Sequence, residues 1–399
     1  PEIISENEYL NYLYEFLNLQ SENDFIIFLG IAVIAIFLLR GIFSMALTVL
    51  RMIFTRYFHV DITNNLFRHY LNIEYKEFSR RNTSSATEIL VNETLYITNS
   101  INDLIIFLTE VILIVLIIFT LFFIDWKITF ATLIIFSFLA LLTTPVTKIL
   151  TQRGIERAET QIAIYDLLFE ALSNFKAIKI LSSTALFTKK LLVSLDKFAK
   201  NQVWYISIAE LPKYFIELTA ITFLILLILN LNNNNSDTSS WLPLISTLAM
   251  AFYRLLPSVN RIISTFNQLK YNKKATEVIL NEFSIPEENP KKNNIEISFK
   301  NNLVFKDISL SYENKPILKN ANLEIKFGEK VAITGPSGSG KTTFLDIIMG
   351  ITKPNEGEVL IDNESLTSSH LRSWRSQIGY VPQGNYLLNT SVEENISFG

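Results

Sequence analysis

The sequence of 399 residues is nearly neutral, with a formal net charge of -3, and it contains no cysteine. This charge balance excludes the bulk basic character of nucleic-acid-binding proteins, so no nucleic-acid partner is expected. The lack of thiols excludes disulfides and thiolate metal sites. The three histidines, His59, His69 and His370, are scattered without metal-ligand spacing.

Long and almost uncharged apolar runs interrupt the sequence from Phe25 to about Leu269, whereas the composition from Ile295 onward is that of a soluble α/β domain. A helix needs about twenty apolar residues to cross a bilayer. The runs therefore predict membrane spans at residues 25–50, 104–124, 128–145, 214–231 and 241–263. Buried helices of a soluble protein are the alternative, and uninterrupted runs such as IIFLTEVILIVLIIFTLFFI argue against it.

The charges between these spans predict their orientation. Residues 1–24 and the loop 231–240 carry no Lys or Arg, whereas the long loops 51–101 and 148–213 are basic. The positive-inside rule places the two basic loops and the C-terminal domain in the cytoplasm. Five spans then leave residue 1 outside, although the chain begins with Pro and has no signal peptide. We therefore expect one further span upstream, so that the parent protein has six.

The segment Asn281–Asn294 is polar, contains Pro and lacks periodicity, which predicts a linker between a transmembrane domain at 1–280 and a soluble domain at 295–399. Beyond the linker, IEISFKNNLVF and NLEIKF alternate like strands. Further on, Gly379–Gln383 resembles a strand that ends in a Pro-Gln corner. The run Lys330–Thr334 reads as a buried strand, and Lys341–Met349 reads as a helix.

Between that strand and helix lies GPSGSGKT, which matches the P-loop pattern G-x-x-x-x-G-K-[ST]. In such a loop the glycines let backbone N–H groups point at phosphate oxygens, and the helix N-terminus adds its dipole. Lys341 is placed to reach the β- and γ-phosphates, and the Thr342 hydroxyl to hold Mg²⁺. A chance glycine-rich turn is the alternative, and the flanking strand and helix argue against it. The predicted phosphate-binding residues are Gly335, Pro336, Ser337, Gly338, Ser339, Gly340, Lys341, Thr342 and Thr343.

The order of Tyr312, the P-loop, KPNEGEVLIDN and GYVPQ resembles the first half of an ABC-transporter nucleotide-binding domain. The resemblance implies that ATP and Mg²⁺ bind here and that Tyr312 stacks on the adenine. It also implies that Gln383, in VPQ, contacts Mg²⁺ and faces the membrane domain, and that Lys341 and Gln383 take part in catalysis. A half-buried strand tyrosine is the alternative for Tyr312.

Three parts of that family's pattern do not follow Gln383: the LSGGQ signature, the Walker B strand with its catalytic Glu, and the switch His. Asp346 and Asp362 do not replace them, because neither ends a continuous apolar strand. We therefore interpret the chain as truncated at both ends. By itself it is expected to bind Mg-ATP weakly and to hydrolyse none.

The spans and basic loops ahead of the nucleotide domain resemble an ABC exporter half-transporter. The implied fold is a membrane all-α ABC exporter transmembrane domain, with five of six spans present, followed by the N-terminal part of an α/β P-loop nucleotide-binding domain. The resemblance also implies that spans continue into the cytoplasm and that a short helix at each loop tip docks on a nucleotide domain. The candidates are Ile73–Ser85 and Leu172–Ser183.

Four cations inside or beside the spans are candidates for substrate contact: Arg40, Lys213, Arg254 and Arg261. An Arg at membrane depth is costly and usually faces a cavity or a partner. Arg254 and Arg261 are seven residues apart and project from one face of a helix. A cavity shared by these cations would suit an anionic head group, and pyrophosphate matches Arg. Snorkelling at the cytoplasmic end is the alternative for Lys213, Arg254 and Arg261.

The stretches FLLRGIFSMALTVL, NFKAIKI, ELPKYFIE and FYRLLPSVNRIISTFNQL resemble the bacterial lipid-linked oligosaccharide flippases of the N-glycosylation pathway. The resemblance implies an ATP-driven homodimer in the bacterial inner membrane, among membrane lipids, that flips an anionic polyprenyl-pyrophosphate-linked glycan. Two alternatives stay open. One is an exporter of another substrate, such as a lipid A-like glycolipid, a peptide or a drug. The other is a catalytically inactive, nucleotide-binding membrane regulator.

Overall fold

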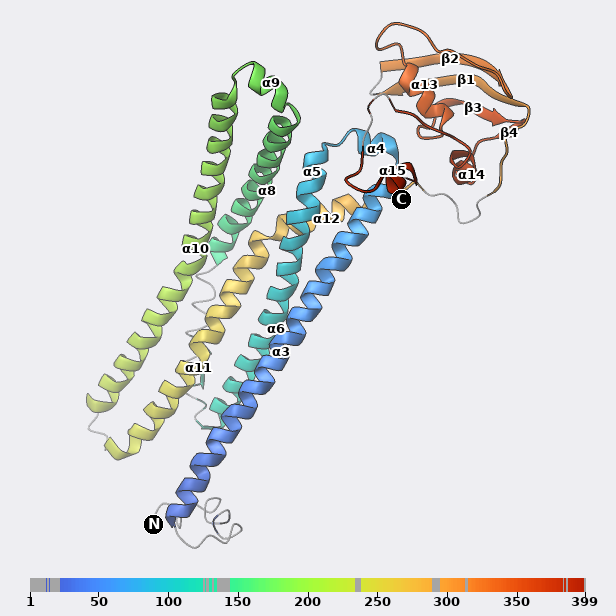
Figure 1. Ribbon diagram of the computed structural model, residues 1–399. Helices are drawn as coiled ribbons and strands as arrows, with labels where there is room; N and C mark the ends of the chain where they lie inside the picture. The colour runs from blue at the N-terminus through green and yellow to red at the C-terminus, as the bar shows by residue number, and fades with distance from the viewer. Residues whose placement is uncertain are drawn as a thin grey trace. The chain divides into compact units, whose positions relative to one another are not determined.

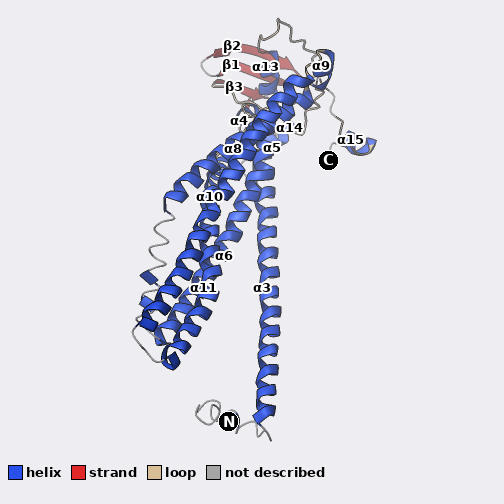
Figure 2. Ribbon diagram, turned by 90° about the vertical axis from the view of Figure 1, so that its left-hand side faces the viewer, coloured by secondary structure: helices blue, strands red, loops and turns tan. Residues whose placement is uncertain are grey.

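A computed structural model describes residues 12, 14, 22–124, 126, 129–130, 133–134, 144–233, 238–288, 295–312, 315–382, 384 and 387–397. The chain divides into two compact units. The first joins Pro1–Leu66 to Thr83–Glu282, and the second joins Phe67–Asn82 to Phe283–Gly399. The described strands all lie in the second unit, as the secondary-structure colouring of Figure 2 shows.

Helices, most of them long, build the first unit (Figure 1). They are α3 (Glu22–Asn72, whose last turns belong to the second unit), α5 (Thr83–Glu88), the π-helical turn η1 (Ile89–Glu93), α6 (Thr94–Ile124), α8 (Thr144–Ser173), α10 (Thr184–Asn233), α11 (Thr238–Tyr271) and α12 (Lys273–Phe283). At about 1.5 Å per residue, the 51 residues of α3 reach about 75 Å, well beyond a hydrocarbon core of about 30 Å. The helices therefore continue far past their apolar segments.

Two described helices, Asn23–Asn72 and Thr83–Phe123, are long and apolar enough to cross a membrane. The first contains the predicted span 25–50, and the second contains all but the last residue of the predicted span 104–124. Leu39 and Ile42 of α3 are 67% and 68% exposed, as expected for side chains that face lipid. The predicted spans 214–231 and 241–263 fall in α10 and α11, and most of the predicted span 128–145 lies outside the described residues.

Short helices stand at the two predicted loop tips. They are α4 (Tyr75–Ser79), in the second unit, and α9 (Phe175–Ile180), in the first. Both segments expected to hold a short helix therefore do so, and their docking on a nucleotide domain stays a prediction.

A four-stranded antiparallel sheet of order β2-β1-β3-β4 forms the centre of the second unit. Its strands are β1 (Asn302–Tyr312), β2 (Lys315–Lys326), β3 (Glu356–Ile361) and β4 (Glu364–Ser365), and its helices include α13 (Lys341–Ile348), α14 (Leu371–Arg375) and α15 (Val392–Ser397). Leu303 and Phe305 of β1 are buried at odd positions, whereas Ile308 and Leu310 are buried at even ones. A register shift between Phe305 and Ile308 lets both pairs reach the core.

Two predicted strands are wrong. Residues 330–334, expected as a buried strand before the P-loop, form no strand, and Val331 is 43% exposed. Residues 379–382 form none either, and Val381 is 88% exposed. An apolar run becomes a central strand only where neighbouring strands pair with it, and no described strand pairs with either segment.

The first three residues of the predicted linker 281–294 belong to α12, and Glu287 and Glu288 in its middle are held in place within the second unit. The Glu288 carboxylate accepts two hydrogen bonds from the Arg375 guanidinium of α14, at 2.9 and 2.6 Å. The Glu288 backbone N–H donates to the Asn72 carbonyl at 2.6 Å, and Glu287 lies 2.8 Å from His69 Nδ1. The end of α3 and α14 are therefore both tied to this short segment.

Candidate functional site

The P-loop turns into α13 through glycines in a conformation that other residues rarely adopt. Gly340 is the N-cap of α13 and has φ +87°. A Cβ atom at this position would lie 3.0 Å from Ile317 Cγ2 of β2. Gly338 also has a positive φ, of +80°. Glycine is therefore needed both for the backbone conformation and, at Gly340, for the close approach to β2.

The Lys341 ammonium folds back over the loop. Its Nζ donates to the carbonyl oxygens of Gly335 at 2.8 Å and Pro336 at 2.7 Å, and lies 3.5 Å from Ser339 Oγ. These partners are neutral, so a phosphate anion can replace them at the cation without leaving a charge unpaired. This cradle, at the N-terminus of an eight-residue helix, fits the phosphates of a nucleotide.

The sheet brings the predicted adenine-stacking residue to the same end of the second unit. Tyr312 is the last residue of β1 and pairs with Lys315, the first residue of β2. Two residues further along, Ile317 lies beside Gly340 of the P-loop. The backbone therefore places Tyr312 near the phosphate cradle. Gln383, the other residue inferred from the family resemblance, lies outside the described residues.

The carboxylate of Asp362 is engaged in holding the backbone. Desolvation is the largest single influence and raises its pKa, but the backbone N–H groups of Asn302, Asn301 and Lys300, each at 2.8 Å, together outweigh it and hold the pKa below its ordinary value. At Asp346, burial raises the pKa instead. Asp362 therefore has a structural role, which agrees with its exclusion as a Walker B substitute.

The membrane half contains a cavity of about 190 Å³ between α10 and α11. The residues that line it are Ala209, Glu210, Lys213, Asn260, Arg261, Ile263 and Ser264. Two of the four predicted substrate cations, Lys213 and Arg261, are therefore brought together. The other two, Arg40 and Arg254, are exposed and are not among the lining residues. The Arg40 guanidinium lies 5.8 Å from the ring of Phe37, on its own helix.

The acidic partner of Arg261, which is not itself a lining residue of this cavity, was missed from the sequence. Arg261 Nη1 lies 2.8 Å from Glu110 Oε1 of α6. The Glu110 side chain is only 9% exposed, whereas that of Arg261 is 59% exposed. The signal was present, because Glu110 is a lone charge inside the apolar run IIFLTEVILIV, and such charges usually have a partner. The positive charge of Arg261 is therefore compensated within the bundle.

A second Arg–Glu pair joins different helices of the same unit. The Arg157 guanidinium of α8 contacts both carboxylate oxygens of Glu93 in η1, at 3.0 Å each. It also lies 3.7 Å from the ring of Tyr96 and 3.3 Å from Gln161 Oε1. The two charged side chains are 0% and 1% exposed, so this pair is enclosed by protein.

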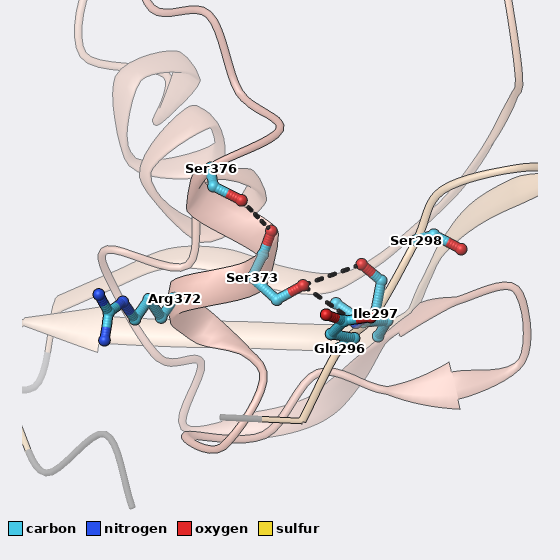
Figure 3. Close-up of a pocket in the computed structure, with 6 residues that line it drawn as sticks. All are labelled: Glu296, Ile297, Ser298, Arg372, Ser373 and Ser376. Atoms are coloured by element: carbon cyan, nitrogen blue, oxygen red, sulfur yellow. Dashed lines mark hydrogen bonds between the residues drawn. The ribbon is translucent and has the colours of Figure 1, made fainter. Parts of the chain in front are cut away.

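A larger cavity, of about 450 Å³, lies elsewhere in the second unit (Figure 3). Its residues are Glu296, Ile297, Ser298, Arg372, Ser373 and Ser376, and none belongs to the P-loop. The Ser373 hydroxyl donates to the Ile297 carbonyl and accepts from the Ile297 N–H, each at 3.1 Å. The Ser376 hydroxyl donates to the Ser373 carbonyl at 2.8 Å. The Ser373 hydroxyl thus joins α14 to Ile297, whereas the Ser376 hydroxyl bonds back to α14 itself. Because no P-loop residue lines this cavity, it is separate from the predicted phosphate site.

Comparison with known proteins assigns families to both halves. Residues 6–231 match the family described as ABC transporter transmembrane region, and residues 318–398 match the family described as ABC transporter. The ATP-dependent lipid A-core flippase of Syntrophus aciditrophicus (strain SB) is 24% identical over 375 residues, which cover 92% of this chain and 62% of that protein.

The mitochondrial iron-sulfur clusters transporter ATM1 of Kluyveromyces lactis is 28% identical over 284 residues, which cover 68% of this chain and 38% of that protein. The chain thus spans less than two thirds of the length of either relative. A solved structure of a bacterial Atm1-family ABC exporter with ATP bound is similar at a TM-score of 0.80 and 17% identity. That similarity covers 97% of this chain and 69% of the other, and it identifies a shared fold.

Proposed function

The chain belongs to the ABC transporter family and has the fold of an exporter of that family, and on this premise we propose that its parent protein is an ATP-driven flippase for a lipid-linked oligosaccharide. In this proposal the cargo is a glycan carried on a polyprenyl pyrophosphate. The protein is a multi-pass membrane protein, and the proposed location is the bacterial inner membrane with the nucleotide-binding domain in the cytoplasm.

In this proposal the nucleotide-binding domain supplies the energy for transport. Lys341, released from the Gly335 and Pro336 carbonyls, would hold the β- and γ-phosphates, while Thr342 would hold Mg²⁺. Tyr312 would stack on adenine, and Gln383 would contact Mg²⁺. Bound ATP contributes the energy of phosphoryl transfer. Two copies of the protein are proposed to close over the nucleotide, as a homodimer.

The observation that carries the substrate proposal is the pairing of Lys213 and Arg261 at one cavity between α10 and α11. Lys213 immediately precedes the predicted span 214–231, and Arg261 lies near the end of the predicted span 241–263. By the positive-inside prediction, both lie at the cytoplasmic ends of their spans, where lipid head groups are found. Arg and Lys at this depth suit the pyrophosphate of a lipid carrier, whose tail can stay beside the bundle. Arg40 and Arg254 are proposed to meet the cargo outside this cavity.

A lipid A-type glycolipid is the second candidate cargo, because one relative is named a lipid A-core flippase and its similarity covers 92% of the chain. Lipid-stimulated ATP hydrolysis by the full-length protein in nanodiscs separates the candidates. We expect the largest stimulation from a polyprenyl-pyrophosphate glycan. A response to lipid A alone would favour the second candidate, and a response to peptides alone would contradict both.

Our proposal for the 399-residue chain by itself is that it hydrolyses no ATP. It lacks the family's signature and Walker B motifs after Gln383, and so lacks a residue to polarise the attacking water. Phosphate release by the purified chain is the measurement. Hydrolysis that disappears in Lys341→Ala would contradict this proposal. Hydrolysis that persists in Lys341→Ala would instead indicate a contaminating enzyme.

A further inference from the structure

We infer that Arg375 is a positioning residue, which joins the end of the P-loop helix α13 to the end of α3 and so links the nucleotide site to a membrane helix of the same chain. The inference rests on the nucleotide site of the proposed function and is independent of the proposed cargo. It runs through the segment 287–288, and not through the short helices at the loop tips.

The end of α13 is fixed to α14 by side chains of α14. The Trp374 indole N–H donates to the carbonyl of Ile348, the last residue of α13, at 2.7 Å, and Arg375 Nη2 donates to the Gly350 carbonyl at 2.5 Å. The last carbonyls of a helix have no partner within it, so these bonds satisfy them. Gly350 has φ +65°, and a Cβ there would lie 2.7 Å from Leu371 Cδ2. The end of α13 and α14 therefore form one packed body.

The same guanidinium also holds the segment 287–288. Arg375 Nη1 and Nη2 donate to the two carboxylate oxygens of Glu288 at 2.9 and 2.6 Å. Nη2 carries two hydrogens, so it serves Glu288 and the Gly350 carbonyl together. Because the guanidinium is planar and rigid, a displacement of one acceptor is passed to the other. We call the bonds from Arg375 to Gly350 and Glu288 the Arg375 bridge.

The segment 287–288 is in turn bound to the end of α3. The Glu288 backbone N–H donates to the carbonyl of Asn72, the last residue of α3, at 2.6 Å. Glu287 forms an antiparallel bridge with Ile73, and its carboxylate lies 2.8 Å from Nδ1 of His69, whose side chain is 6% exposed. Since α3 is one continuous helix, a displacement of its last turn is carried toward its apolar segment.

The nucleotide acts at the opposite end of α13. Lys341 is the first residue of this helix, and in the proposed function its ammonium leaves the Gly335 and Pro336 carbonyls for the phosphates. The helix has eight residues, about 12 Å, and buries Phe344 and Ile347 in the core. A helix so short and so packed shifts as a rigid body. The Arg375 bridge therefore lies on a continuous path of contacts from the phosphate cradle to the end of α3.

Hydrogen exchange of the full-length protein in nanodiscs tests the bridge, with Mg²⁺ and the non-hydrolysable ATP analogue AMP-PNP as the probe. In wild type, the analogue should slow exchange of the amides in segments 69–73 and 287–288 at least about fivefold. In Arg375→Gln that slowing should fall below about twofold, while the affinity for the analogue stays within about threefold of wild type. A merely structural role would not separate these two quantities.

Two further variants sharpen this test. Glu288→Ala breaks the Arg375 bridge from its other side and should give the same loss of slowing. The double variant should lose no more than either single variant, because all three remove one bridge. Arg372→Gln is the matched control, since Arg372 lies on the same helix but lines the cavity of Figure 3 and contacts neither Glu288 nor Gly350. It should show the slowing of wild type.

The inference is overturned if the slowing persists in Arg375→Gln or Glu288→Ala, or if the losses of the two variants add. Should Arg375→Gln fail to fold, Glu288→Ala decides, because it leaves the bonds from α14 to α13 in place. Wild type that binds the analogue without slower exchange at these segments overturns the inference and leaves the proposed function standing. Wild type that does not bind the analogue contradicts both.

Discussion

The two cross-helix Arg–Glu pairs of the helical unit have the same chemistry and nearly the same distances, but they differ in burial. Arg157 and Glu93 lie 3.0 Å apart and are 0% and 1% exposed, whereas Arg261 and Glu110 lie 2.8 Å apart and are 59% and 9% exposed. Tyr96 and Gln161 also lie against Arg157. Arg261 instead faces a cavity. The comparison teaches that exposure of the guanidinium decides whether such a pair is structural or available to a ligand.

The largest expected effect is at the enclosed pair. Glu93→Gln should lower the free energy of unfolding by about 3–5 kcal/mol, because it leaves the fully buried Arg157 without a counter-ion. Chemical denaturation in detergent measures the change. Glu156→Gln is the matched control, because its pair with Arg153 has the same chemistry at 2.7 Å but is about one third exposed. That change should cost about 1 kcal/mol or less. Equal losses of unfolding free energy in the two variants would contradict the claim that burial makes the Arg157–Glu93 pair structurally important.

Lys341 in the P-loop differs from both arginines, because its hydrogen-bond partners are neutral carbonyl oxygens. Lys341→Ala removes a charge held by two carbonyl oxygens and leaves no charged partner behind. Nucleotide affinity should fall at least about tenfold, since the lysine is the main cation at the phosphates, while stability without nucleotide should stay unchanged. Thermal melting with and without Mg-ATP reports both quantities. A variant that melts lower without nucleotide would indicate that Lys341 also has a structural role.

The open pair should respond weakly in stability. Glu110→Gln leaves Arg261 unpaired but mostly exposed, so water replaces the lost counter-ion and the cost should be about 1 kcal/mol or less. The same denaturation measurement applies as for Glu93→Gln. A loss as large as that of Glu93→Gln would show that both pairs mainly stabilise the fold, and it would contradict the availability of Arg261 to a ligand.

The smallest effect on stability is expected at Asp362, whose carboxylate is held by backbone amides and not by an arginine. The folded-state pKa of Asp362 lies below its ordinary value of 3.8, so its contribution to stability is present above pH 3.8 and is lost as the pH falls through the folded pKa. Asp362→Asn keeps an acceptor oxygen and tolerates the φ of +49°. Wild type should therefore lose stability more steeply than this variant below about pH 4. Parallel curves from denaturation at each pH would refute this assignment.

Local patterns predicted the parts that depend on local physics. The glycines and Lys341 were readable because a P-loop needs those residue types at fixed spacing, and α13 follows where expected. The long helices followed from apolar length, and the short helices α4 and α9 occupy the two expected loop tips. The π-helical turn that carries Glu93 has no comparable local signature.

The features that escaped prediction depend on partners distant in the sequence. The run 330–334 has the composition of a buried strand, but composition does not supply a neighbouring strand. The same holds for charge. Arg261 reads as a free cation until α6 brings Glu110 beside it, and Arg157 reads as one of many loop arginines until η1 and Tyr96 enclose it. Burial and pairing arise from packing, which the sequence pattern leaves open.

ATP-dependent translocation in proteoliposomes tests the central claim most directly. The full-length protein that carries this chain is reconstituted, and movement of a polyprenyl-pyrophosphate glycan is compared with that of a neutral polyprenyl glycan. The account predicts ATP-dependent movement of the pyrophosphate lipid alone, abolished by Lys341→Ala and reduced at least about tenfold by Arg261→Gln. Equal movement of the neutral lipid, or full activity in Arg261→Gln, would contradict it.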